Sequence, residues 1–271
     1  MRHLAFALVA LFVSSPLFAC INTYGVNLRG EQVRSGFGGE DLVRYLTEPS
    51  PTNWRQVKAR IGVKFSGASL DERNDYAAAL MHLGEVQDAL KILTKIEQEK
   101  PGLYATATNL GTAYELAGDN ARALQWIAEG IRRNRHSHDE SEWLHVRILQ
   151  AKLNLEKDPQ WLRTNAILAM GFGSARVPNP PSRFPVGNDG KPLDAERTAD
   201  AIQYQMKERL QFVKPPEPIV GDILFDYANL LMRTDILETA DAVYKLAIEY
   251  GAPRAALAKQ RREFIRTRLK R

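Results

Sequence analysis

The fold is decided by a stretch of thirty residues, 104–133, which reads YATATNLGTAYELAGDNARALQWIAEGIRR. Its first half places Leu110, Gly111 and Tyr114 at helical spacing. The residues at 118–120 then break the pattern, because their glycine supplies the backbone freedom that a tight turn needs. A second run of apolar residues at helical spacing follows the turn. The stretch therefore predicts two antiparallel helices that pack together as a hairpin.

The preceding stretch, 70–99, repeats the pattern at an offset of 34 residues, since 104 − 70 = 34. The matching pairs are Gly84 with Gly118, Ala89 with Ala123, Leu90 with Leu124 and Leu93 with Ile127. A fixed period of this length is typical of stacked helical hairpins, because one hairpin cannot bury its apolar face alone. Chance similarity of two amphipathic hairpins is the alternative, and the matched glycine and alanine positions argue against it.

This pattern resembles the tetratricopeptide repeat family. The residues that carry the resemblance are Leu110, Gly111, Tyr114, Gly118, Ala123 and Ile127 in the later copy, and Ala77, Leu80, Gly84, Ala89, Leu93 and Pro101 in the earlier one. The earlier copy departs from the family at Ala77, where the family favours glycine. The resemblance implies an all-α solenoid of helical hairpins, in which the first helix of each hairpin lines a concave surface that takes peptides or protein segments.

The repeat pattern becomes irregular after the second copy. Residues 70–170 are expected to hold tetratricopeptide hairpins, with a degenerate third copy whose first helix runs from Trp143 to about Leu155. Its second helix comes either from 158–170 or only after an interruption. The predicted segments that follow are a proline-rich loop at 171–193, a helix and linker at 194–220, and a final hairpin with a basic capping helix at 221–271.

The first nineteen residues have the pattern of a secretory signal peptide: a short basic start, the apolar run Leu4–Val13 and a break before Ala19. The chain's single cysteine, Cys20, follows at once, and Leu17–Cys20 resembles a bacterial lipobox. Lipidation of Cys20 and plain cleavage after Ala19 are both open. Either outcome predicts an exported protein, periplasmic or membrane-anchored, with residues 20–69 as an N-terminal cap outside the repeats.

The C-terminal segment 253–271 is strongly basic, with eight lysines or arginines and one acidic residue, Glu263. It predicts an amphipathic helix whose arginines, Arg261 among them, lie largely away from the apolar side. Such a face is either a solvated surface of the capping helix or a contact for anionic lipid headgroups. We expect no nucleic-acid partner for an exported chain.

Catalytic motifs do not stand out in this sequence. No GxSxG nucleophile motif occurs, and the chain has no cysteine after Cys20, so we expect no enzyme activity, no cofactor and no bound metal. The alternative is a periplasmic metal- or small-ligand-binding protein, or an enzyme, that uses the turn at His136 and His138 with the proline-rich loop. Imidazoles and carboxylates are suitable zinc ligands, but their spacing here fits no strong zinc signature.

The resemblance transfers a partner-binding groove to specific positions of this chain. These positions are Asp71, Asn74, Met81, His82, Thr108, Thr112, Glu115, Asp139, Glu142, Asn229 and Arg233. The set leans acidic, which favours a basic or neutral partner by charge complementarity. The sequence therefore predicts an exported tetratricopeptide-repeat scaffold that mediates protein–protein interaction in the bacterial cell envelope.

Overall fold

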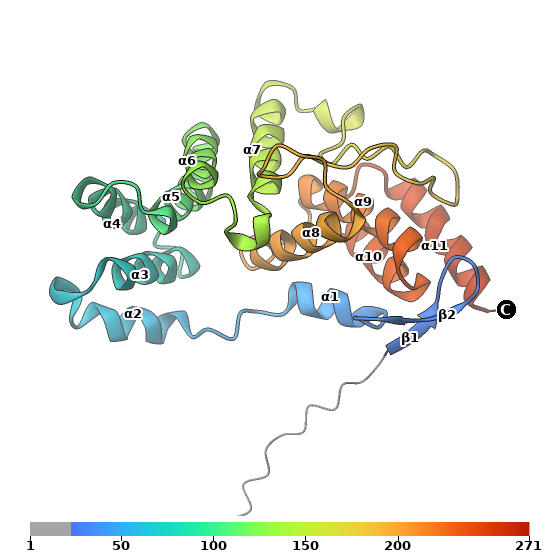
Figure 1. The fold of residues 1–271 in the computed structure, drawn as a ribbon, viewed down its shortest axis with the longest axis horizontal. Helices are drawn as coiled ribbons and strands as arrows, with labels where there is room; N and C mark the ends of the chain where they lie inside the picture. Colours follow the sequence, from blue (N-terminus) through green and yellow to red (C-terminus); the bar gives the residue numbers. More distant parts are fainter. Residues whose placement is uncertain (1–22, 271) are drawn as a thin grey trace, which may run out of the picture.

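The computed structural model describes residues 23–270, and this part of the chain is all-α apart from one short β-hairpin (Figure 1). The predicted signal peptide, residues 1–19, and Cys20 lie outside the described residues. The strands are β1 (Thr23–Val26) and β2 (Gln32–Ser35), paired antiparallel with Tyr24 opposite Arg34. The helices are α1 (Glu40–Thr47), α2 (Trp54–Gly62), α3 (Leu70–His82), α4 (Val86–Glu99), α5 (Tyr104–Leu116), α6 (Asn120–Arg133), α7 (Glu142–Lys157), α8 (Ala195–Arg209), α9 (Pro218–Thr234), α10 (Leu237–Glu249) and α11 (Ala255–Leu269).

Helices α3 to α6 form two consecutive hairpins, as the two matched sequence stretches predict. Ser69 begins α3 with a capping box, because its hydroxyl accepts from the Glu72 amide and the Glu72 carboxylate accepts from the Ser69 amide. Gly84 and Gly118 adopt positive φ angles of 82° and 85° in the two turns. Gly111 lets α5 approach α6, since a Cβ at this position would lie 2.5 Å from Ile127 Cδ1.

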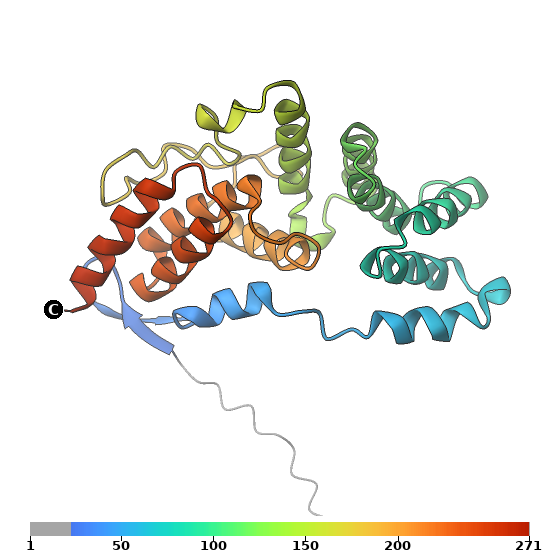
Figure 2. The ribbon, with the colours of Figure 1, turned by 180° about the vertical axis from the view of Figure 1, so that it is seen from behind.

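The C-terminal part is a bundle built around α9. Every residue of α9 from Ile219 to Met232 is buried, because α8, α10 and the segments beside them cover it on all sides (Figures 1 and 2). Helix α11 packs on α10 and completes the bundle. One hydrophobic cluster runs from α7 through this bundle, and a separate, smaller cluster fills the hairpins α3 to α5.

The long segment between α7 and α8 contains no helix longer than one turn. Residues 158–170 form only a short 3₁₀ turn at Trp161–Arg163. Of the two alternatives for the second helix, the one at 158–170 is therefore absent, and the next helix, α8, follows after the proline-rich segment 171–193. That segment lies against the bundle, with Phe172 and Leu193 buried in its core. No helix of residues 23–270 is long and apolar enough to cross a membrane.

The expected N-terminal cap divides into two parts. Helix α2 covers α3, whereas the β-hairpin and α1 pack on α10 at the other end of the molecule (Figure 1). An extended segment, 48–53, connects them. The sequence prediction missed this division, because the run from Pro49 to Asn53 resembles an ordinary turn.

Helix α11 also differs from its prediction at one position. Arg261 is fully buried, although it was expected on the solvated side. Its guanidinium donates to the carbonyl oxygens of Gly173 and Ala175, and to the side chain of Asn229. The arginine faces inward because the proline-rich segment brings carbonyl groups to this side of the helix.

Candidate functional site

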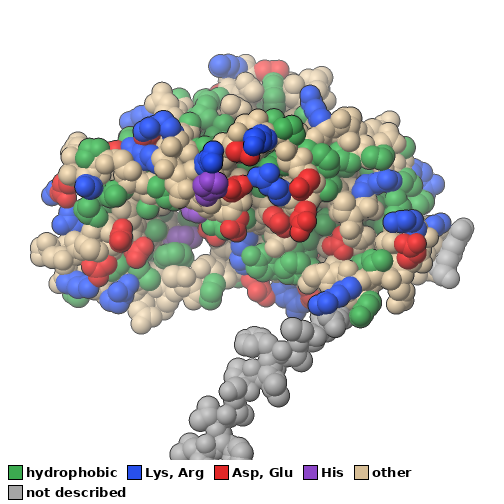
Figure 3. Space-filling model, viewed as in Figure 1, with side chains coloured by type: hydrophobic (Ala, Val, Ile, Leu, Met, Phe, Trp, Pro, Cys, Tyr) green, Lys and Arg blue, Asp and Glu red, His purple; other side chains and the backbone are tan. Residues whose placement is uncertain are grey.

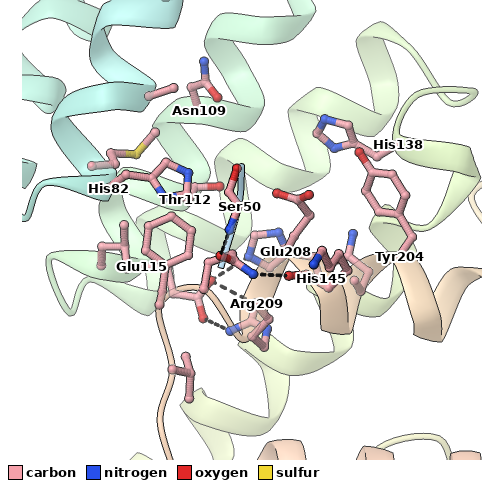
Figure 4. A pocket seen from close by; sticks show the side chains of 18 of the residues that line it. Ser50, His82, Asn109, Thr112, Glu115, His138, His145, Tyr204, Glu208 and Arg209 are labelled. Atoms are coloured by element: carbon pink, nitrogen blue, oxygen red, sulfur yellow. Dashed lines mark hydrogen bonds and ion pairs between the residues drawn. The ribbon is translucent and has the colours of Figure 1, made fainter. Parts of the chain in front are cut away.

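A cavity of about 560 Å³ lies between the helical hairpins and the C-terminal bundle (Figure 4). Helices α3 and α5 supply one wall, α7 and α8 the other, and the extended segment 48–53 crosses beside them. Its lining includes the side chains of Trp54, Met81, His82, Thr112, Glu115, Glu142, His145, Lys152, Tyr204, Lys207, Arg209, Gln211 and Phe212. Elements far apart in sequence therefore meet at this cavity.

Glu115 is the centre of a buried ion network in the wall of this cavity. Its side chain is 7% exposed, hydrogen-bonds to Arg209 at 2.7 and 3.2 Å and to His145 at 2.6 Å, and forms an ion pair with Lys152 at 2.7 Å. Burial opposes ionisation, but Arg209 and His145 outweigh it and hold the pKa of Glu115 well below its usual value. This network joins α5 of the hairpins to α7 and α8.

Glu142 extends the network along α7. Its carboxylate pairs with His138 at 2.5 Å and lies 3.5 Å from His145. Burial raises the pKa of Glu142, but the hydrogen bonds from these two imidazoles outweigh burial and bring it down to about 2. Burial lowers the pKa of His145, but the neighbouring Glu115 carboxylate outweighs burial. The net effect is a raised pKa for His145. The wall therefore holds carboxylates and imidazole rings in alternation.

An aromatic stack forms the opposite side of the cavity. The His82 ring lies between Trp54, at 4.0 Å and nearly parallel, and Phe212, at 4.4 Å between ring centroids. Burial lowers the pKa of His82 to about 4, so this imidazole is neutral at physiological pH. Trp54 comes from α2 and Phe212 from the segment after α8, and neither belongs to the predicted groove.

The extended segment 48–53 is held at the cavity through its backbone. The Gln211 side chain donates to the Glu48 carbonyl at 3.0 Å and accepts from the Ser50 amide at 2.7 Å. Lys207 Nζ donates to the carbonyls of Tyr45 and Glu48 at 2.6 and 3.0 Å. These contacts recognise main-chain groups, which every polypeptide carries, and do not depend on the side chains of the bound segment.

The structure places only part of the predicted groove at this cavity. The five residues that line it are Met81, His82, Thr112, Glu115 and Glu142. Asp139 lies in an adjoining recess of about 380 Å³ that shares Tyr45 and Tyr204 with the cavity. Asp71 and Arg233 are exposed but line neither space.

Three of the predicted groove residues are buried. Asn74 donates to Thr106 Oγ1 at 3.2 Å between neighbouring helices, and Thr108 packs beneath Gly130. Asn229 is fully buried in α9, where it accepts hydrogen bonds from Tyr244 and Arg261. These three side chains are covered by neighbouring elements and line neither space.

The expected acidic character of the groove is also corrected. Within the cavity, Glu115, Glu142 and Glu208 are matched by Lys152, Lys207 and Arg209. The three cations come from α7 and α8, at positions outside the pattern that defined the groove. Nothing in their sequence context distinguishes them from surface cations, so only the fold could show that they converge.

The histidine turn gives no metal-ligand arrangement. His136 Nδ1 lies 2.6 Å from Glu140, and His138 Nδ1 lies 2.5 Å from Glu142, so each ring faces a carboxylate four residues further along the chain. Within residues 23–270, no group of three or more His, Cys, Asp or Glu side chains has a geometry that could hold a metal ion. The turn instead has positive φ angles from His138 to Glu140.

Comparison with protein-family models and with curated proteins gives no match for this chain. The side chains that line the cavity indicate what it can bind. It combines an aromatic surface, equal numbers of carboxylates and cations, and side chains that hydrogen-bond to main-chain groups. These are properties of a binding site, in which Glu115 and Glu142 are already paired and shape and backbone contacts select the ligand.

Proposed function

We propose that this chain is a tetratricopeptide-type helical scaffold that binds an extended protein segment at the cavity. The observation that carries the proposal is the chain's own irregular segment 48–53, whose Glu48 carbonyl and Ser50 amide are bound at the cavity by Gln211 and Lys207. A surface that holds one extended segment through main-chain contacts can hold another beside it or in its place.

The spacing of the helices supports a tetratricopeptide-type scaffold. The pairs α3–α4 and α5–α6 repeat at 34 residues with a glycine turn in each. We interpret α7 with α8 as a third pair, into which the proline-rich segment is inserted, and α9 with α10 as a fourth. The insertion moves α8 away from α7 in sequence while leaving the two in contact, which provides the second wall of the cavity.

We further propose that the protein is exported and acts in the bacterial cell envelope. The support is the pattern of the first nineteen residues and the lipobox-like Leu17–Cys20. Mass spectrometry of the mature N-terminus tests this. A diacylated Cys20 supports membrane attachment, cleavage after Ala19 without lipid supports a periplasmic protein, and an intact Met1 in the host would contradict export.

Site-specific photocrosslinking tests the binding site. A photoreactive residue at Thr112, which lines the cavity, should crosslink to a defined envelope protein in intact cells. The matched control is Thr94, an exposed threonine of α4 away from the cavity. Glu115 is unsuitable for substitution, since its loss would leave Arg209 buried without a partner.

The outcome that contradicts the proposal is the same set of crosslinked proteins from both threonines. A second measurement uses the crosslinked partner's own segment as a synthetic peptide. Replacing Lys207 and Gln211 by alanine releases the segment 48–53, so the affinity for that peptide should change by a factor of several. No change, in a variant that folds normally, would show that the peptide does not use this site.

A further inference from the structure

The two ends of the described chain meet at one end of the molecule. The β-hairpin and α11 both pack on α10, and Arg268 of α11 donates to the carbonyl of Leu28 in the hairpin turn at 3.4 Å. Figures 1 and 2 show the C-terminus beside β1 and β2 in both views. The described chain begins at this end with Thr23. Each strand of the hairpin is four residues long, which is about 13 Å at the rise of a β-strand.

The outward side of α11 carries a row of cations. Lys259, Arg266 and Lys270 are exposed at spacings of seven and four residues, which places them on one helical face. Glu263 is the acidic residue within this row. The buried residues Ala258, Arg261 and Ile265 define the opposite face, which packs on the bundle. The row therefore faces solvent along the length of the helix.

The hairpin adds further cations and exposed apolar groups to the same end. The Arg29 side chain in the turn is 82% exposed, and Arg34 is exposed on β2. Opposite Arg34 lies Tyr24, which is 61% exposed, and Leu269 at the end of α11 is 36% exposed. Figure 3 shows lysine and arginine side chains gathered at the right-hand end, over the region of α11.

We propose that this surface, formed by α11 and the β-hairpin, docks on the anionic headgroups of a phospholipid bilayer. Cations attract anionic lipid, and an exposed tyrosine and leucine beside them suit the boundary between headgroups and acyl chains. The position of Thr23 is the independent support. Cys20 lies three residues before it, so a lipid on Cys20 would hold this end of the molecule next to the membrane.

Nucleic acid would match the cations but not the rest of the surface. A polyphosphate offers nothing to Tyr24 and Leu269 except stacking on bases, and the row on α11 is interrupted by Glu263. A fluid bilayer can accommodate both features, because lipids rearrange around an isolated carboxylate. The docking surface is distinct from the cavity, so the proposal does not rest on the proposed peptide binding.

Vesicle binding of the purified full chain tests the proposal. The protein should bind phosphatidylcholine vesicles that contain phosphatidylglycerol more tightly than pure phosphatidylcholine vesicles, and added salt should reduce the difference. The triple variant Lys259→Glu, Arg266→Glu, Lys270→Glu should lose this preference. Each cation near an anionic surface contributes about fivefold in binding, so three predict a loss of about 100-fold.

The matched control is Lys91→Glu, Lys95→Glu, Lys100→Glu, which makes the same change in net charge on exposed residues of and after α4, at the far end. This control variant should change the preference for anionic vesicles by less than about threefold, if the position of the cations on α11 matters more than the net charge of the protein. Equal losses in both variants, or no loss in the α11 variant, would overturn the proposal. The proposal would also be overturned if the protein bound a duplex oligonucleotide more tightly than anionic vesicles and the α11 triple variant lost that binding.

Discussion

The hairpins α3–α6 and the bundle α9–α11 are both packed helices, but different interactions hold them. The buried side chains of the hairpins are mostly alanine, leucine and isoleucine, and many of their ion pairs, such as Arg132 with Glu129, lie on the surface. The bundle buries Asp222, Asp226 and Arg261 in its core. Complementary side-chain packing stabilises the hairpins, and a buried polar network contributes to the stability of the bundle.

The two regions differ because they bring together segments at different distances along the chain. In the hairpins, each helix packs on its neighbour in sequence, so complementary small and large side chains suffice. In the bundle, the proline-rich segment must be attached to α11, some 86 residues away. Loop carbonyls need hydrogen-bond donors when they are buried, and Arg261 supplies them. A buried arginine therefore appears where an irregular segment meets a helix.

Arg261→Met should produce the largest effect in this comparison. The substitution keeps the volume but leaves the carbonyls of Gly173 and Ala175 without their donor, and leaves the Asn229 side-chain oxygen with Tyr244 alone. Each buried acceptor left unsatisfied costs ~1–3 kcal/mol of unfolding free energy, so two cost ~2–6 kcal/mol. Urea denaturation measures this loss, and proteolysis within 171–193 should accelerate. The exposed Arg266→Met is the matched control, and equal behaviour of the two variants would refute the argument.

The second-largest difference between the hairpins and the bundle is expected in how the unfolding free energy depends on pH. Burial raises the pKa of Asp226 to about 6 despite the nearby Arg254, and Asp222 adds to the rise. An unfolded aspartate titrates near pH 3.9, so the folded state binds this proton more tightly. The stabilising contribution of the protonated form is present below about pH 4 and is lost as the pH rises through about 6.

The two pKa units correspond to ~2–3 kcal/mol, since each unit is worth ~1.4 kcal/mol. Asp226→Asn cannot ionise, so its unfolding free energy should fall less than that of the wild type between about pH 4 and pH 7. Denaturant titrations across this range provide the measurement. Parallel pH profiles for the two proteins would show that the core carboxylate does not titrate as described.

Gly111→Ala should have an intermediate effect in the hairpins. The added Cβ would lie 2.5 and 2.6 Å from the Ile127 side chain and 3.1 Å from its backbone nitrogen, so α5 and α6 must move apart. Overpacking of this kind costs ~1–3 kcal/mol, and the better helix propensity of alanine returns up to ~1. The control is Gly67→Ala, where the new Cβ meets no atom within 4 Å. Equal stability of the two variants would contradict close packing at Gly111.

The smallest effect is expected for Arg132→Ala on the surface of α6. This side chain is 73% exposed and its partner Glu129 also pairs with Arg133. Solvent screens such pairs, so the thermal unfolding midpoint should stay within experimental error of the wild type. A clear loss of stability would mean that surface charge, and not side-chain shape alone, holds the hairpins.

The regular helices could be predicted closely from the sequence. The helices predicted at 86–99 and 104–116 match α4 and α5, and the helix predicted at 255–271 starts where α11 starts, because apolar periodicity and glycine or proline breaks are local signals. The cavity was only partly predictable. Met81, His82 and Thr112 follow from the hairpin pattern, whereas Trp54 and Arg209 reach the cavity through the connection 48–53 and through α8, and no local pattern indicates their meeting.

The sequence by itself determined the helical hairpins, since burying a periodic apolar stripe against the next helix requires only neighbouring residues. It also determined the basic character of the C-terminal segment. Tertiary structure alone decided that Arg261 and Asn229 are buried, that Lys152 and Arg209 pair with Glu115, and that the β-hairpin meets α11. The physical reason is distance along the chain, because burial and charge pairing depend on every element that packs nearby.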